Sequence, residues 1–255
     1  MPADAPNVHR GAAHYRPAVL FVHEIHRVMG QHEEAFEEAF RAELLPALGA
    51  DADARLLYFM RLAHGTGRAY NFVTLTGVTD GAAWEQLAHR LQLGDLRDWA
   101  RRIDAMRWDV TAKMLAPAEW SPLQTVDFAH VPTDAGEHDQ TLFMEDTAWP
   151  HAGMLEDYLE AARDNYAPSL AEGRHGGRSL LELQAVFCPA WGAAARRREV
   201  ILWQRVTRPS GIVGLLTSEV PAEHRAPGTW MHDALRVRDD WESRLLRTAP
   251  WSPLF

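Results

Sequence analysis

An internal repeat limits this chain to folds that are built from two copies of one unit. The motif Trp-Ser-Pro-Leu occurs at 120–123 and returns at 251–254, which is an offset of 131 positions. At that offset, nine of the 25 positions in 99–123 and 230–254 are identical. Chance pairing would give about one or two identities, so we interpret the pattern as a duplication.

The rest of each copy aligns at slightly smaller offsets, as small loop insertions would produce. Residues 20–21 correspond to 142–143, and residues 68–78 correspond to 196–206. The stretch 127–140 is polar, contains Pro and Gly, and is typical of a linker. We therefore predict a first repeat over 1–126, a linker over 127–140 and a second repeat over 141–255.

Hydrophobic patterning predicts the same order of elements in each copy. In the first copy we expect strands at 18–28, 55–63, 69–78 and 108–116, and helices at 31–48 and 81–106, the second broken near Gly94. In the second copy we expect strands at 141–149, 179–189, 199–208 and 239–247, and helices at 154–165 and 230–238. The Pro and Gly residues of 207–227 favour more loop there. Each copy is thus a β-α-β-β-α-β unit of the ferredoxin-like type.

A sheet of this kind carries its helices on one face and leaves the other face bare. Two such sheets can cover each other's bare faces. We therefore predict an α+β fold in which two tandem ferredoxin-like repeats pack as one pseudo-dimeric α+β barrel. An internal pocket between the sheets is expected to bind a small molecule.

Two short motifs resemble the NIPSNAP family of the dimeric α/β-barrel superfamily. One is the ending Lys-Met-Leu-Ala-Pro-Ala-Glu-Trp-Ser-Pro-Leu at 113–123, and the other is Glu-Ile-His at 24–26, where the family usually has Glu-Leu-Arg. The sequence departs from the family by carrying His26 in place of Arg and Asp-Thr-Ala at 146–148 in the second copy. The resemblance implies the barrel fold and admits a non-enzymatic binding or interaction protein.

Composition excludes several classes of protein. A formal net charge of −9 gives no electrostatic basis for binding nucleic acid. Cys188 is the only cysteine, so an intrachain disulfide is impossible. We see no secretory signal and no apolar run of the roughly 18 residues that a membrane helix needs, and we expect a cytoplasmic protein without membrane partners.

The first strand offers an acid–base pair. Alternate residues of a strand point to opposite faces, so Glu24 and His26 share one face while His23 lies on the other. A carboxylate and an imidazole at this spacing suit proton transfer. We expect His26 to act as base with Glu24 as its partner, opposed across the barrel by the carboxylates of Glu145 and Glu182.

Substrate contacts are expected from residues predicted to face the cavity. The strand that holds Glu182 is apolar on its opposite face, so Gln184 should point inward with it. The remaining candidates come from the equivalent strand of the first copy and from the final strands of both copies: Tyr58, Met60, Lys113 and Arg244.

These residues favour a small-molecule enzyme that needs no cofactor. It would use acid–base chemistry on an apolar or aromatic substrate, as an isomerase, lyase, cyclase or cofactor-free oxygenase. One alternative is a barrel that binds haem or a divalent metal through His23 or His26. Another is a NIPSNAP-like binding protein without catalysis. A homodimer is compatible with all three hypotheses.

Overall fold

Eight antiparallel strands close into a ring in the computed structural model, which describes residues 19–172, 180–191, 198–217 and 222–255. Their order around the ring is β1-β3-β2-β8-β5-β7-β6-β4. The strands of the first repeat are β1 (Leu20–Val28), β2 (Ala54–Leu62), β3 (Asn71–Val78) and β4 (Arg107–Pro117). Those of the second are β5 (Leu142–Pro150), β6 (Leu181–Trp191), β7 (Val200–Val206) and β8 (Arg238–Thr248).

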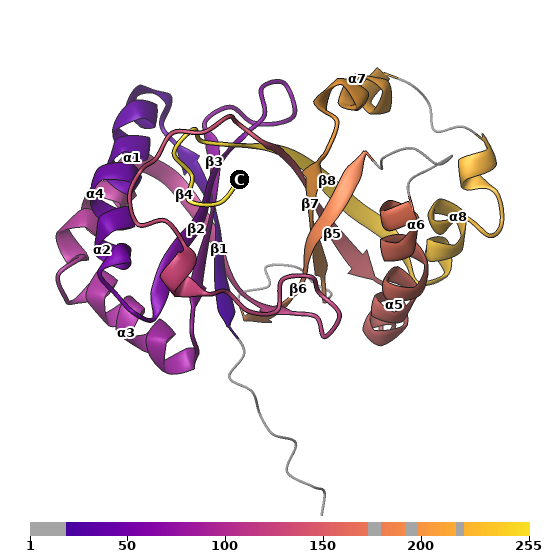
Figure 1. Cartoon of the computed structure of the whole chain (residues 1–255), viewed down its shortest axis with the longest axis horizontal. Helices are drawn as coiled ribbons and strands as arrows, with labels where there is room; N and C mark the ends of the chain where they lie inside the picture. Colours follow the sequence, from indigo (N-terminus) through magenta and orange to yellow (C-terminus); the bar gives the residue numbers. More distant parts are fainter. Residues whose placement is uncertain (1–18, 173–179, 192–197, 218–221) are drawn as a thin grey trace, which may run out of the picture.

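The helices cover the outer face of each sheet, on opposite sides of the molecule (Figure 1). The first repeat has α1 (Glu33–Ala39) and α2 (Leu45–Gly49), joined by a π-helical turn (Phe40–Leu44), and then α3 (Gly81–Gln92) and α4 (Arg97–Met106). The second has α5 (Leu155–Ala161), a π-helical turn (Ala162–Tyr166), α6 (Ala167–Glu172), α7 (Pro209–Thr217) and α8 (Trp230–Asp233). Within the described part of the chain, no helix is long and apolar enough to cross a membrane.

Each repeat forms one four-stranded half of the ring, β4-β1-β3-β2 and β8-β5-β7-β6. The halves join through two short seams: three residue pairs link β2 to β8, and four link β4 to β6. The predicted fold class, two ferredoxin-like repeats that form one barrel, is therefore confirmed.

The repeated Trp-Ser-Pro-Leu motif ties each repeat to the other one. The hydroxyl of Ser121 accepts a hydrogen bond from the backbone N–H of Val186 in β6, at 2.9 Å. The hydroxyl of Ser252 accepts one from the N–H of Phe59 in β2, at 3.1 Å. The two tails thus satisfy strand N–H groups across the seams, which would otherwise be unpaired in the interior.

The space between the two sheets is filled by side chains rather than left as a wide chamber. Its core includes the large buried residues Phe21, Met60, Phe143, Phe187 and Trp203. The predicted linker contributes Phe128 and Val131 to the same core. The linker therefore packs into the barrel as well as connecting the repeats.

Region 207–227, predicted to contain more loop than its counterpart in the first repeat, holds the nine-residue helix α7 (Pro209–Thr217). Pro209 stands at its first position, where the missing N–H of proline has no intrahelical partner to lose. Ile212 is buried on its inner side. The predicted break near Gly94 is confirmed, because α3 ends at Gln92 and α4 begins at Arg97.

Candidate functional site

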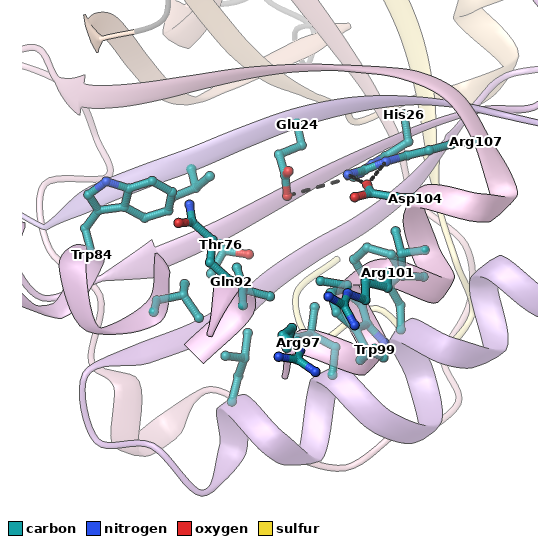
Figure 2. Close-up of a pocket in the computed structure, with 18 residues that line it drawn as sticks. Glu24, His26, Thr76, Trp84, Gln92, Arg97, Trp99, Arg101, Asp104 and Arg107 are labelled. Atoms are coloured by element: carbon teal, nitrogen blue, oxygen red, sulfur yellow. Dashed lines mark hydrogen bonds and ion pairs between the residues drawn. The ribbon is translucent and has the colours of Figure 1, made fainter. Parts of the chain in front are cut away.

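A cavity of about 370 Å³ lies on the outer face of the first sheet, beneath its helices (Figure 2). This volume lies in the range of small-molecule sites. Seven aliphatic side chains from the helices and β1 form part of its wall. The polar and aromatic lining residues are Glu24, His26, Phe40, Thr76, Trp84, Gln92, Arg97, Trp99, Arg101, Asp104 and Arg107.

Strand and helix geometry explains why these side chains converge. Alternation along β1 points Glu24 and His26 outward, toward the helices. Helix α3 begins after Asp80, whose carboxylate accepts a hydrogen bond from the N–H of Ala83 at 2.9 Å. From α4, the indole N–H of Trp99 donates to the carbonyl of Ala39 at 3.0 Å, which fixes that ring against α1.

His26 is held as a neutral ring by its two partners. The Nη1 of Arg107 lies 2.7 Å from Nδ1 of His26, and Oγ1 of Thr74 lies 3.1 Å from its Nε2. Because arginine can only donate, Nδ1 must accept, and the ring proton sits on Nε2. Burial, together with the positive charge of Arg107, lowers the pKa of His26 well below its ordinary value.

Glu24 has the opposite perturbation. Burial raises the pKa of its carboxyl, and the attraction of Arg107 only partly offsets this effect. Its Oε2 lies 4.0 Å from Nε2 of His26, and the side chain is partly exposed to the cavity. A carboxylate with a raised pKa at a cavity wall is suited to accept a proton near neutral pH.

The predicted pair is therefore brought together, and the geometry favours Glu24 over His26 as the member that could accept a proton. The lone pair of His26 that could accept a proton points at Arg107. The other ring nitrogen of His26, Nε2, carries the proton and donates to Thr74.

The sheet separates this pair from the other predicted catalytic residues. Glu145 lies inside the barrel, where Nε2 of His23 and Nη1 of Arg244 each approach its carboxylate at 2.8 Å. Burial would raise the pKa of Glu145, but His23 and Arg244 outweigh it and lower the pKa to about 2. The prediction that Glu145 opposes Glu24 in one site is wrong in its geometry, because the two side chains project from opposite faces of the ring.

Other predicted contacts also face the barrel interior. Nζ of Lys113 lies 2.5 Å from Oε1 of Glu199. Tyr58 packs against Phe143 and Trp203, and burial raises its pKa to about 12. Met60 is fully buried in the same core. The inward orientation of these residues is as predicted, but they line packed core rather than the cavity.

The two remaining predictions fall at the rim. Glu182 is exposed, and its Oε2 accepts a hydrogen bond from Nε of Arg205 at 3.1 Å. Gln184 stands at the bulge where the register of β6 shifts between Leu183 and Ala185. Neither residue lines the cavity beside Glu24.

Sequence reasoning missed Arg107, Trp99 and Thr74. A signal for two of them was present, since Arg107 and Trp99 are identical to Arg238 and Trp230 at the repeat offset. For the metal alternative, no group of three potential ligands occurs among the residues that the structure describes. His23 and His26 point to opposite faces of β1, so one ion cannot bind both.

Comparison with known proteins identifies the fold of the chain but no sequence family. No family model and no curated protein sequence matches the chain. A predicted monooxygenase from Lactobacillus acidophilus is similar in structure, with a TM-score of 0.55 at 8% identity over 92% of this chain and 97% of that one. An anthrone oxidase-like protein gives 0.55 at 9% identity over 91% and 92%. The chain has the dimeric α/β-barrel fold.

A NIPSNAP-like protein from Burkholderia xenovorans is similar over 42% of this chain and 91% of that one, at 19% identity and a TM-score of 0.35. The predicted barrel fold is confirmed, and membership of the NIPSNAP family stays a prediction.

Proposed function

We propose that this protein is a small-molecule enzyme in which Glu24 removes a proton from an apolar or aromatic substrate. The observation that carries the proposal is a carboxyl of raised pKa beside a neutral histidine in a cavity lined by aromatic and apolar side chains. Perturbed titratable groups in a cavity are typical of functional sites.

The cavity supplies binding and charge stabilisation as well as a base. Trp84 and Trp99 offer flat apolar surfaces for a ring. Removal of a proton leaves negative charge on the substrate. Arg107 beside Glu24, and Arg97 and Arg101 on α4, are cations placed to stabilise that charge.

Isomerases, lyases, cyclases and cofactor-free oxygenases can all begin with this proton transfer. We favour the oxygenase, since two proteins of similar fold carry the names of oxygen-using enzymes. The reaction would convert a methylene group and one O₂ into a carbonyl group and one water. The substrate anion supplies the electrons, so the reaction is predicted to proceed without haem, flavin or metal.

A binding protein without catalysis is the competing hypothesis, and it is the one that NIPSNAP membership would favour. Such a protein needs no carboxyl poised for proton transfer. Convergence of Glu24, His26 and Arg107 on the cavity argues against it. Haem binding by His26 is disfavoured because both ring nitrogens already have partners.

The test is a screen of aromatic compounds that bear an acidic methylene or hydroxyl group, anthrone among them. Oxygen uptake and product mass are measured with purified wild-type protein, with and without a metal chelator. We expect turnover that survives the chelator and that Glu24→Gln abolishes. Tight binding of a compound with no turnover in either protein would support the binding-protein hypothesis instead.

A further inference from the structure

A second cavity, of about 400 Å³, lies at the seam where β2 of the first repeat meets β8 of the second. The β2–β3 hairpin forms one wall. Its charged lining residues are Arg61, Arg68, Arg247 and Glu33, with His64 on the hairpin. Three guanidinium groups thus share the cavity lining with one carboxylate.

Two of these arginines are direct cross-strand neighbours. Arg61 on β2 pairs in register with Arg247 on β8, and like charges in that position repel. Arg61 is balanced by ion pairs with Glu33, at 2.6 Å, and with Glu37. Among the residues that the structure describes, no carboxylate lies within ion-pair distance of Arg247, and its buried Nε makes no hydrogen bond. A partly buried donor without a partner is unfavourable, and an anion in the cavity would relieve it.

The rest of the wall also suits an anion. Arg68 and His64 are exposed on the hairpin and line the same cavity. The hairpin holds Gly65 at φ +82° and Tyr70 at φ +58°, and the second value is strained for a residue with a side chain. Such strain often marks a binding loop.

Asn71 narrows the chemistry of the ligand. Its Oδ1 is buried in the cavity wall without a hydrogen bond, so a ligand with a hydrogen-bond donor would satisfy it. A carboxylate ion has oxygens for the arginines but offers no donor. A hydrogenphosphate group offers both, since its oxygens accept from guanidinium groups and its hydroxyl donates.

We propose that this cavity binds the phosphate group of a small phosphorylated molecule, with Arg247 and Arg68 as the principal donors. The site is separate from the cavity beside Glu24 and does not depend on its chemistry. Because only three residue pairs join β2 to β8, a ligand that neutralises Arg247 would also strengthen this seam between the repeats.

Isothermal titration and thermal unfolding of the full chain with inorganic phosphate test the proposal, at an ionic strength held constant with chloride. We expect saturable binding, together with a rise in the unfolding temperature that neither chloride nor acetate reproduces. Arg247→Gln and Arg68→Gln should each weaken phosphate binding by about tenfold or more, as expected for loss of a charged hydrogen bond.

Arg163→Gln is the matched control, because Arg163 is exposed and pairs with Asp164 far from the cavity in sequence. It removes one positive charge and should leave phosphate affinity unchanged. Arg68 lies on an exposed turn, so its variant is expected to fold even if Arg247→Gln does not. Acetate binding equal to phosphate, or unchanged affinity in Arg68→Gln, would overturn the proposal.

Discussion

The two repeats share one topology but use the space beneath their helices differently. In the first repeat that space is a cavity beside Glu24. In the second, Tyr166 stands where the first has Leu44, and Gln204 where it has Thr76. The hydroxyl of Tyr166 donates to Gln204, whose amide donates to Asp146, the counterpart of Glu24, at 2.9 Å.

The position of His26 shows the same divergence. Its counterpart is Ala148, which is buried in the core of the second repeat. Larger side chains, and the loss of the histidine, have turned an equivalent site into packed core. The carboxyl that lines a cavity in the first repeat is thus held by hydrogen bonds from Gln204 and Ser243 in the second.

The difference between the two repeats is tested most directly at their equivalent carboxyls, Glu24 and Asp146. Glu24→Gln should lower kcat by about 100- to 10,000-fold, the usual contribution of a general base. Asp146→Asn should leave kcat unchanged, because both carboxylate oxygens of Asp146 already accept hydrogen bonds, from Gln204 and Ser243. Steady-state kinetics on a substrate from the screen measures both. Equal losses in the two variants would show that the second repeat also takes part in catalysis.

The ion pair that joins the repeats carries the largest expected effect on folding. Glu145→Gln removes the buried anion that His23 and Arg244 share, and Arg244 keeps only its more exposed pair with Glu242. The substitution should cost about 3–5 kcal/mol of the free energy of unfolding at pH 7. Glu182→Gln, in an exposed pair with Arg205, should cost less than about 1 kcal/mol. Denaturant titration at pH 7 compares the two variants.

In the wild-type protein, acid should weaken the stabilising interactions of Glu145 with His23 and Arg244. The pKa of Glu145 is lowered to about 2 in the folded protein from 4.5. Its stabilising effect is complete above pH 4.5 and is lost as the pH falls from 4.5 toward 2, because only the unfolded chain takes up the proton there. The loss is at most about 3 kcal/mol. A wild type and a Glu145→Gln variant with parallel acid unfolding curves would refute this account.

Exchange of the equivalent side chains between the two repeats tests whether those side chains decide if a cavity is present. Tyr166→Leu with Gln204→Thr should open the second repeat at a cost of about 1–3 kcal/mol in stability. Leu44→Tyr with Thr76→Gln should fill the first. Titration with an apolar fluorescent probe should give one additional site in the first double variant and one fewer in the second. Unchanged stoichiometry in both would mean that these side chains do not control the cavities.

The smallest predicted effect concerns pH. Catalysis needs ionised Glu24, so the rate should rise with pH through a pKa above 4.5. Arg107 holds that pKa down, and Arg107→Gln should move the rising limb upward by about one unit. Arg102→Gln is the control, because Arg102 lies on α4, the helix that precedes Arg107, and pairs with Glu43 outside the cavity lining. A limb that moves downward in Arg107→Gln would exclude Glu24 as the base.

The sequence predicts the fold well because the duplication and the strand alternation act over the whole chain. It predicts the site less well for a reason visible in β1. Both faces of this strand are buried, one in the barrel and one beneath helices, and each face mixes apolar and polar residues. Alternation shows that Glu24 and His26 share a face, but it cannot say which face meets a cavity.

The missed residues have a second cause. Thr74 and Arg107 reach His26 across the sheet from β3 and from the start of β4. Their proximity depends on strand register, which a single sequence does not specify at this position. The proposal that Glu24 and not His26 is the base rests on these two contacts, which periodicity cannot predict.

The pair formed by His23 and Glu145 has a consequence for the history of the barrel. The two residues are separated by 122 positions, the offset that relates β1 to β5, so each is the other's counterpart. A barrel assembled from two identical chains would set this position against itself, as two histidines or two glutamates. A fused chain can place an imidazole opposite a carboxyl there, and each repeat then favours its covalent partner over a copy of itself. The fusion has made self-pairing of either half the poorer choice.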